Sequence, residues 1–250
     1  MSTWILLRGL VRESGHWGAF VPQFEYAVPD AQVHLLDLPG NGQLYAQRSP
    51  TQIDAMVDAC RRQLQAAGVA PPYALLALSM GGMVAVQWAH RYPGEIERQV
   101  LVNTSMQPFS SYYHRLQTRN WGTIATLLLG RASGLQWEQA ILRMTTTQPH
   151  LDVLPAWQSL RQVHPVSTAN ALRQLWAAAR FTAPLVPPAV PTLLLASSQD
   201  ALVSVQCSRA IARAWNVSLR EHPQAGHDLS LDDPHWVAQQ VRRWQLEQKL

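Results

Sequence analysis

The stretch LLALSMGGMVAVQWAHRYP, residues 75–93, carries the strongest indication of the chain's architecture. Its first residues form a continuous apolar run, typical of a strand buried on both faces, and its second half has apolar residues at helical spacing. Ser79 stands at the junction, with Ala77 two residues before it and Gly81 two residues after it. A sharp strand-to-helix turn strains the backbone at its centre, so small neighbours are needed on both sides. The stretch therefore predicts a strand, a tight turn at Ser79 and a helix that begins near Met80.

The same alternation runs through most of the chain. Short apolar runs predict buried strands, and between them apolar residues recur three and four positions apart, as in amphipathic helices. Strands are predicted over 4–10, 33–38, 73–78, 99–102 and 192–196, and helices over 16–28, 53–67, 80–92, 205–215 and 234–248. Continuous apolar strands that alternate with helices indicate a mainly parallel, doubly wound α/β sheet, because helical crossovers cover both faces of each strand.

One region, residues 106–188, breaks this alternation. It contains no convincing strand pattern, and tryptophans punctuate its helical stretches. The proline-rich stretch APLVPPAVP, residues 183–191, then leads back to a strand. We expect an α/β core over residues 1–105 and 189–250, and a helical cap over 106–188. The cap should lie over the carboxyl edge of the sheet, where open α/β sheets bind ligands.

Composition limits the function classes. The chain has 250 residues, 47% of them hydrophobic, which is enough to bury one substantial core. It contains neither a membrane-spanning apolar run nor a basic leader followed by a cleavage site, which predicts a soluble, cytoplasmic protein without membrane insertion. Cys60 and Cys207 lack the spacing of metal ligands, so we expect two small buried thiols, with no metal and no cofactor.

The charge distribution is uneven. The net charge is +4, and 19 of the 20 basic residues are arginines. Residues 105–188 contain seven arginines and two acids, giving +5, so the remainder has 13 basic and 14 acidic residues, or −1. Such a segment could attract an acidic partner, or it could simply be a set of solvated helix faces. No basic run is interleaved with aromatic residues, which argues against nucleic-acid binding.

An aspartate and a histidine, both more than 100 residues after Ser79, are its candidate partners. Asp200 follows the predicted strand 192–196, and His227 comes 27 residues later in a glycine-flanked loop before the last helix. A serine hydroxyl needs a base to become a nucleophile, and a neutral histidine needs an acceptor that holds its ring. Alone, such an aspartate is more often a helix or turn cap and such a histidine is more often structural. Their order along the chain predicts a Ser79–His227–Asp200 triad.

These residues carry a resemblance to a known superfamily. The turn Ala-Leu-Ser-Met-Gly-Gly at 77–82, the Asp37–Gly42 stretch after a strand, the Asp200 loop and Ala-Gly-His at 225–227 together resemble the α/β-hydrolase superfamily over nearly the whole chain. Among its branches, the sequence looks most like the small capped esterases exemplified by pimeloyl-[acyl-carrier protein] methyl ester esterase. Read from its own residues, 37–42 is only a tight turn without chemistry. Two departures are alanine in place of the first glycine of the serine turn, and Arg8-Gly9 where the superfamily usually has His-Gly.

The resemblance implies further site residues. The backbone N–H groups of Leu10 and Met80 would form the oxyanion hole. Arg8 would either be tied to an acid such as Glu13 or bring a cation near the pocket and favour anionic substrates. A segment that includes Ile141, Met144 and Thr145 would line the substrate channel. The apolar residues Leu127, Leu128, Leu129 and Leu142 suggest a hydrophobic acyl chain, although they could equally be cap core. The cap arginines suggest an acidic acyl-carrier protein as a partner.

The predicted function is a serine carboxylesterase that acts on small to medium acyl esters through an acyl-enzyme, with no cofactor. Serine in the tight turn indicates acyl transfer to water, whereas an aspartate there would indicate epoxide or haloalkane chemistry. Two alternatives stay open. One is a thioesterase or amidase, and the other is a ligand-sensing protein that kept the fold and lost turnover.

Overall fold

A computed structural model describes residues 2–130 and 133–248 of the chain. In this part of the chain the strands form one sheet with the order β2-β1-β3-β4-β5-β6, and every neighbouring pair is parallel. The strands are β1 (Ser2–Leu7), β2 (Ala31–Leu36), β3 (Tyr73–Leu78), β4 (Ile96–Val102), β5 (Thr192–Ser197) and β6 (Ser218–His222). The prediction of a doubly wound parallel α/β sheet is confirmed.

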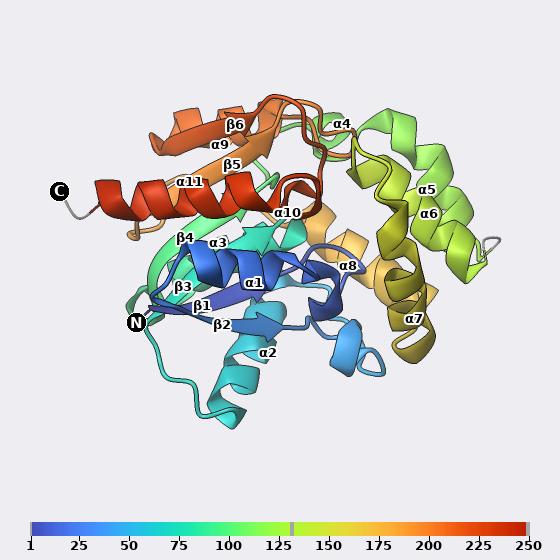
Figure 1. The fold of residues 1–250 in the computed structure, drawn as a ribbon, viewed down its shortest axis with the longest axis horizontal. Helices are drawn as coiled ribbons and strands as arrows, with labels where there is room; N and C mark the ends of the chain where they lie inside the picture. Colours follow the sequence, from blue (N-terminus) through green and yellow to red (C-terminus); the bar gives the residue numbers. More distant parts are fainter. Residues whose placement is uncertain (1, 131–132, 249–250) are drawn as a thin grey trace.

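Helices cover both faces of the sheet (Figure 1). Helices α1 and α11 pack together on one face, and α2 and α3 pack together on the other, which α9 also covers. The core helices are α1 (Phe20–Ala27), α2 (Ile53–Ala66), α3 (Met80–Arg91), α9 (Gln206–Trp215), α10 (Leu229–Asp232) and α11 (Pro234–Glu247). Short 3-10 turns add Ser14–Trp17, Gly42–Leu44 and Pro93–Glu95.

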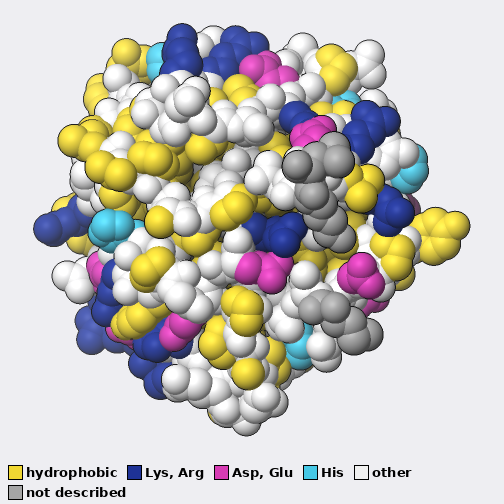
Figure 2. Space-filling model, turned by 90° about the vertical axis from the view of Figure 1, so that its left-hand side faces the viewer, with side chains coloured by type: hydrophobic (Ala, Val, Ile, Leu, Met, Phe, Trp, Pro, Cys, Tyr) yellow, Lys and Arg dark blue, Asp and Glu magenta, His cyan; other side chains and the backbone are white. Residues whose placement is uncertain are grey.

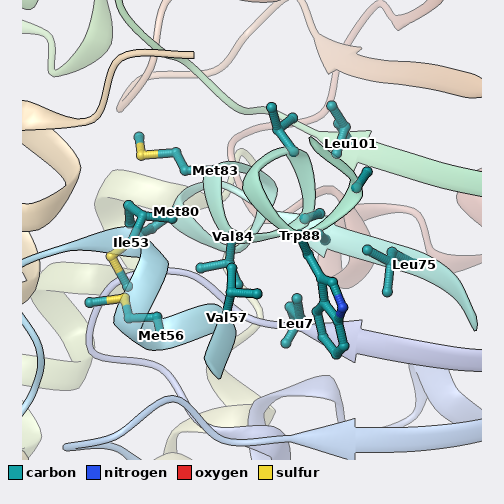
Figure 3. Packing of buried hydrophobic residues seen from close by; sticks show 14 of the residues in the cluster. Leu7, Ile53, Met56, Val57, Leu75, Met80, Met83, Val84, Trp88 and Leu101 are labelled. Carbon is teal, nitrogen blue, oxygen red and sulfur yellow. The ribbon is translucent and has the colours of Figure 1, made fainter. Parts of the chain in front are cut away.

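The alternation of side chains along each strand divides the core into two layers. In β1, Ile5 and Leu7 join the layer under α2, α3 and α9, whereas Trp4 and Leu6 join the layer under α1 and α11. Figure 3 shows the first layer, in which Val84 and Trp88 of α3 lie among side chains of α2 and the strands. Because the inner strands are covered on both faces, they contain apolar runs such as Ala74–Leu78 in β3, which is why the sequence could indicate the sheet.

One strand escaped the sequence analysis. β6, with the sequence Ser-Leu-Arg-Glu-His, lies at the edge of the sheet and pairs only with β5 among the described strands. Its residues are mostly half-buried, because an edge strand is partly open to solvent. Leu219 is its one apolar residue, so it lacks the apolar run by which the other strands, including the edge strand β2, were found.

A helical segment of 106–188 separates β4 from β5. It contains α4 (Tyr112–Arg115), α5 (Trp121–Leu128), α6 (Gly134–Thr145), α7 (Leu154–Val163) and α8 (Thr168–Arg180), with 3-10 turns at Thr118–Asn120 and Leu151–Val153. Within its described residues, β-pairing is limited to a single bridge between Gln107 and Thr182. In Figure 1 the arrowheads of β1 and β2 point toward the side of the molecule where α5–α8 lie. Arg131, one of the seven arginines of this segment, lies outside the described residues.

Both cysteine thiols are buried, as expected. Burial raises the pKa of the Cys60 thiol to about 12 and that of the Cys207 thiol to about 11, so neither is a thiolate near neutral pH. Of the helices described, none combines the length and the apolar character needed to cross a bilayer. Figure 2 shows the face near the two termini, where basic and acidic side chains are interspersed with apolar ones.

Candidate active site

Ser79 occupies the sharp turn that the sequence predicts. Its φ of 58° lies in the left-handed region, which is rare for a residue other than glycine, and it directly precedes the first turn of α3. Its N–H donates to the Val102 carbonyl at 2.9 Å, and its carbonyl accepts from the Thr104 hydroxyl at 2.8 Å. Gly81 is required because a Cβ there would lie 2.7 Å from the Leu7 carbonyl oxygen. The turn, which follows β3, thus contacts the ends of both strands that flank β3, namely β4 and β1.

The loop after β1 contacts this turn. A Cβ added to Gly9 would lie 3.0 Å from the Ser79 Cβ, so only glycine lets the loop approach so closely. In the described part of the chain, the N–H groups of Leu10 and Met80 have no hydrogen-bond acceptor. Val11, with a φ of 53°, turns its own N–H away to the Gln174 side-chain oxygen at 2.9 Å. Leu10 lines the same cavity as Ser79, and Met80 directly follows Ser79 in the chain.

His227 and Asp200 lie together at the carboxyl edge of the sheet. The Nδ1 atom of His227 is 2.7 Å from Oδ2 of Asp200, and both side chains are buried. The second oxygen of Asp200 accepts the N–H groups of Leu202 at 2.8 Å and Val203 at 2.9 Å. These two amides fix the carboxylate, and the carboxylate in turn orients the ring so that Nε2 is left for other partners.

Asn103, at the end of β4, organises the histidine loop and was missed by the sequence analysis. Its φ of 46° is left-handed, and it is buried. Its side-chain amide donates to the His227 carbonyl at 2.8 Å and to the Ser197 hydroxyl at 3.0 Å, while its oxygen accepts from the Ser197 N–H at 2.8 Å. Its position directly after a strand was the available signal.

The end of α6 supports the same loop from the other side. The Asp228 N–H donates to the Thr145 carbonyl at 2.7 Å. A Cβ on Gly226 would lie 2.8 Å from that carbonyl oxygen, so glycine permits the contact. Asp232 accepts from the Gly226 N–H at 2.6 Å and binds His150 at 2.9 Å. The helical segment therefore contacts the backbone on both sides of His227.

Arg8 forms an ion pair with Asp228 rather than with Glu13. Both terminal nitrogens of its guanidinium donate to the Asp228 carboxylate, one of them at 3.1 Å, and the same nitrogen reaches the Ser230 hydroxyl at 3.1 Å. Although burial alone would raise it, the Arg8 guanidinium holds the pKa of Asp228 below its ordinary value. Glu13 instead binds His164 of the helical segment at 2.8 Å. The Arg8–Asp228 pair could not be predicted from the sequence, since the two residues are 220 positions apart.

A second buried ion pair joins the loop after β1 to α6. Arg12 donates to Glu138 and lies 2.8 Å from the His16 ring, and its guanidinium stacks 4.1 Å above the Trp157 ring. Burial, followed by the positive charge of Arg12, lowers the pKa of His16 well below its usual value. Both arginines of the loop are thus held by a carboxylate and an aromatic ring, because Arg8 also stacks 4.8 Å from the centre of Trp17.

Ser79 and His227 line one cavity of about 120 Å³. Of the residues predicted to line a substrate channel, Ile141, Met144 and Thr145 all border it, and so do Arg8 and Leu10. Leu127 and Leu128 border it as well, whereas Leu129 is exposed and Leu142 packs in a separate cluster. The remaining lining residues are Gly9, Val11, Arg12, Leu78, Leu116, Ile124, Trp137, Ala171, Leu175, Leu202 and Asp228.

The Asp37–Gly42 stretch has the structural role that its own residues indicate. The Asp37 carboxylate accepts the N–H groups of Ser14 at 2.7 Å and Gln43 at 2.9 Å. A Cβ on Gly42 would lie 2.1 Å from that carboxylate. Asp37 therefore closes a turn, and it is absent from the cavity lining.

The comparisons with known proteins agree with this geometry. A protein of Klebsiella pneumoniae (strain 342) that carries the provisional name carbamate hydrolase RutD is 27% identical over 242 residues, covering 92% of this chain and 85% of its own. A pimeloyl-[acyl-carrier protein] methyl ester esterase of Chromobacterium violaceum is 28% identical over 222 residues, covering 85% of this chain and 83% of its own. The structure of a thermophilic esterase from Thermogutta terrifontis superposes with a TM-score of 0.77 at 21% identity, covering 99% of this chain and 90% of the other, which shows a shared fold.

The family assignment rests on more than these distant relatives. Residues 4–240 match the Alpha/beta hydrolase family, a span that runs from β1 into α11. This span contains the serine turn, the Asp200 loop and the histidine loop. The chain therefore belongs to the alpha/beta hydrolase family.

Proposed function

We propose that this protein is a serine hydrolase that cleaves carboxylic esters of small to medium acyl groups through an acyl-enzyme. The observation that carries the proposal is the placement of Ser79 and His227 on one cavity, with Nδ1 of His227 bound to Asp200 at 2.7 Å. The esterase name of the Chromobacterium relative supports the same reaction.

The chemistry follows from these positions. His227 Nε2 accepts the Ser79 proton as Oγ attacks the acyl carbon, and Asp200 stabilises the imidazolium that forms. The Leu10 and Met80 N–H groups hold the oxyanion, aided by the N-terminal end of α3. The imidazolium then protonates the departing alcohol. Water repeats the sequence on the acyl-enzyme, releasing the acid and free Ser79.

The helical segment acts in this proposal as a cap over residues 106–188, laid on a core formed by 1–105 and 189–250. Apolar side chains of α5, α6 and α8 line the cavity opposite Ser79, among them Leu127, Ile141 and Leu175. They would receive a hydrophobic acyl chain, since burying apolar surface is favourable by about 25 cal/mol per Å².

Replacement of the nucleophile tests the proposal. Ser79→Ala should keep the fold and lower kcat for p-nitrophenyl esters by about 10⁴- to 10⁶-fold. A fluorophosphonate should label the parent protein at Ser79, and His227→Ala should suppress that labelling. Ester turnover that survives in Ser79→Ala would reject the serine mechanism. A parent protein that neither turns over esters nor takes the label would instead support a ligand-sensing role.

Amide-type substrates are the second candidate. The name of the Klebsiella relative, carbamate hydrolase, favours including them. Matched esters, thioesters, amides and carbamates with one acyl chain should rank esters first by kcat/KM if the proposal holds. If the thioester or the amide has the highest kcat/KM, the reaction is reassigned to that substrate class, with Ser79 still the proposed nucleophile.

A carrier-bound ester is a narrower proposal, suggested by the name of the Chromobacterium relative. The structure restricts which arginines could bind an acidic carrier. Arg115 donates to the Ala178 and Ala179 carbonyls and is half-buried, so its charge serves the helical segment itself. Arg119 and Arg143 are exposed. Arg143→Glu should weaken turnover of a carrier-bound ester more than that of the free ester, and equal effects would argue against a carrier.

A further inference from the structure

The cavity wall contains two arginines but no free positive charge. Besides the imidazole of His227, its ionisable side chains are Arg8, Arg12 and Asp228. Asp228 neutralises Arg8, and Glu138, directly behind the wall, neutralises Arg12. Asp200, behind His227, adds a further negative charge. Each guanidinium keeps one buried nitrogen without a hydrogen-bond partner, Nε of Arg8 and Nη2 of Arg12, but its positive charge is already neutralised by a carboxylate. An ionised group on a bound substrate would therefore find no unpaired counter-charge in the wall.

The Arg8–Asp228 pair is rigidly held. Arg8 is 3% exposed and Asp228 is equally buried, and the Ser230 hydroxyl donates to Asp228 at 2.8 Å while it accepts from Arg8. The Trp17 ring stacks on the guanidinium. Arg8 thus has no room to swing away from Asp228 toward a ligand without leaving a carboxylate buried and unpaired, which is strongly unfavourable.

We propose that the Arg8–Asp228 pair makes this cavity selective for uncharged acyl groups, and that Asp228 is the residue that sets this preference. The inference rests on the proposed esterase function. Of the two alternatives for Arg8, it follows the one in which an acid holds the guanidinium, here Asp228, rather than the one in which Arg8 favours anionic substrates. An acyl chain ending in a carboxylate would lose its hydration on entry and gain no ion pair in return.

Two esters of equal chain length test this selectivity. The parent protein should hydrolyse 4-nitrophenyl hexanoate with a kcat/KM at least about 100-fold above that for mono-4-nitrophenyl adipate, the same chain ended by a carboxylate. Comparable values for the two esters would overturn the selectivity and leave the esterase function standing. Failure to hydrolyse either ester, with Ser79 unlabelled by fluorophosphonate, would overturn the esterase function and the selectivity with it.

Charge variants then identify the determinant. Asp228→Asn leaves Arg8 unpaired on the wall, so the adipate-to-hexanoate ratio of kcat/KM should rise by about 10-fold or more, mainly through KM. Arg8→Gln, which leaves the carboxylate, should move the ratio in the opposite direction. The double variant Arg8→Gln/Asp228→Asn should return the ratio to near the parent value. If Asp228→Asn does not fold, the opposite shift in Arg8→Gln carries the test.

A matched control separates charge from damage to the histidine loop. Asp232→Asn also removes a carboxylate that holds this loop, but Asp232 does not line the cavity and has no arginine partner among the described residues. It should lower turnover of both esters together and leave their ratio within about twofold. A ratio that rises equally in Asp232→Asn and Asp228→Asn, or that stays constant across the Arg8 and Asp228 variants, would refute the role of the pair.

Discussion

Different interactions stabilise the sheet and the helical segment. The sheet lies between two large apolar layers, and its inner strands have almost no exposed side chains. The described part of the helical segment has two small apolar clusters, around Trp137 and Trp157. Its end, including Phe181 and Ala183, joins the apolar layer under α2, α3 and α9, while other contacts with the core are polar. Arg12 with Glu138, Gln174 with Val11 and Glu13 with His164 all cross that boundary. The loops that follow the strands carry the proposed catalytic residues, whereas these polar contacts help to hold the helical segment on the core.

The largest effect is expected within the sheet part of the site. Asp200→Asn preserves the shape of the side chain but removes the charge that stabilises the imidazolium of His227, so kcat should fall by about 10⁴-fold with a small change in KM. Stopped-flow or steady-state assays with 4-nitrophenyl hexanoate measure it. The thermal midpoint should remain within a few degrees of the parent value, and a kcat within tenfold of the parent would contradict the assigned role.

The next effect lies at the boundary between the two regions. Glu138→Gln leaves the buried Arg12 guanidinium without a counter-charge, which should cost about 3–5 kcal/mol in the stability of the packed helical segment. Limited proteolysis should then cut within residues 106–188 before the core is attacked.

A partly exposed ion pair on the α/β core is the matched control for that variant. Arg209 and Glu221 join α9 to β6 with side chains 39% and 28% exposed, so Glu221→Gln should cost at most about 1 kcal/mol by urea unfolding. Equal losses for Glu138→Gln and Glu221→Gln would show that the boundary pair is no more important than a surface pair.

Gln174 connects the helical segment to the proposed oxyanion loop. Its side chain accepts the Val11 N–H and donates to Asn41 at 2.8 Å and Ser49 at 3.0 Å. Gln174→Leu leaves these buried groups unpaired, at about 1–3 kcal/mol. It should also lower kcat about 10-fold by freeing the loop that carries Leu10, with little change in KM. A loss of stability with kcat unchanged would limit Gln174 to a structural role.

The last expected effect is a dependence of stability on pH. The lowered pKa of His16 means that the folded protein binds its proton at lower pH than the unfolded chain does. Below about pH 6.5 the unfolded state therefore holds more protons, and acidification destabilises the fold by up to about 1.4 kcal/mol per pH unit for this group. Between pH 7 and pH 5, the free energy of unfolding should depend less steeply on pH in His16→Gln than in the parent protein. An unchanged slope would contradict the assignment.

The sheet and the turn at Ser79 could be predicted from the sequence, whereas the contacts around the cavity could not. The sheet could be predicted because burial on both faces imposes continuous apolar runs, and the turn at Ser79 because strain there demands Ala77 and Gly81 beside it. The order of Ser79, Asp200 and His227 could be read directly. β6 was missed because Leu219 is the one apolar residue among its five.

The contacts around the cavity could not be predicted for a different reason. Arg8 finds Asp228 across 220 residues, and Arg12 finds Glu138 across 126. No periodicity connects such positions, since pairing of this kind depends on the finished fold. The one sequence signal for Asn103 was its position directly after a strand, where polar residues have many other roles.

The hydrogen bond between the Thr145 carbonyl and the Asp228 N–H ties α6 to the residue that follows His227. Ile141 and Met144 of the same helix line the cavity, so an acyl chain too bulky for the available space would push α6 outward. That displacement would pull on the imidazole through a single peptide unit. Oversized substrates should therefore be discriminated by slower chemistry as well as by weaker binding.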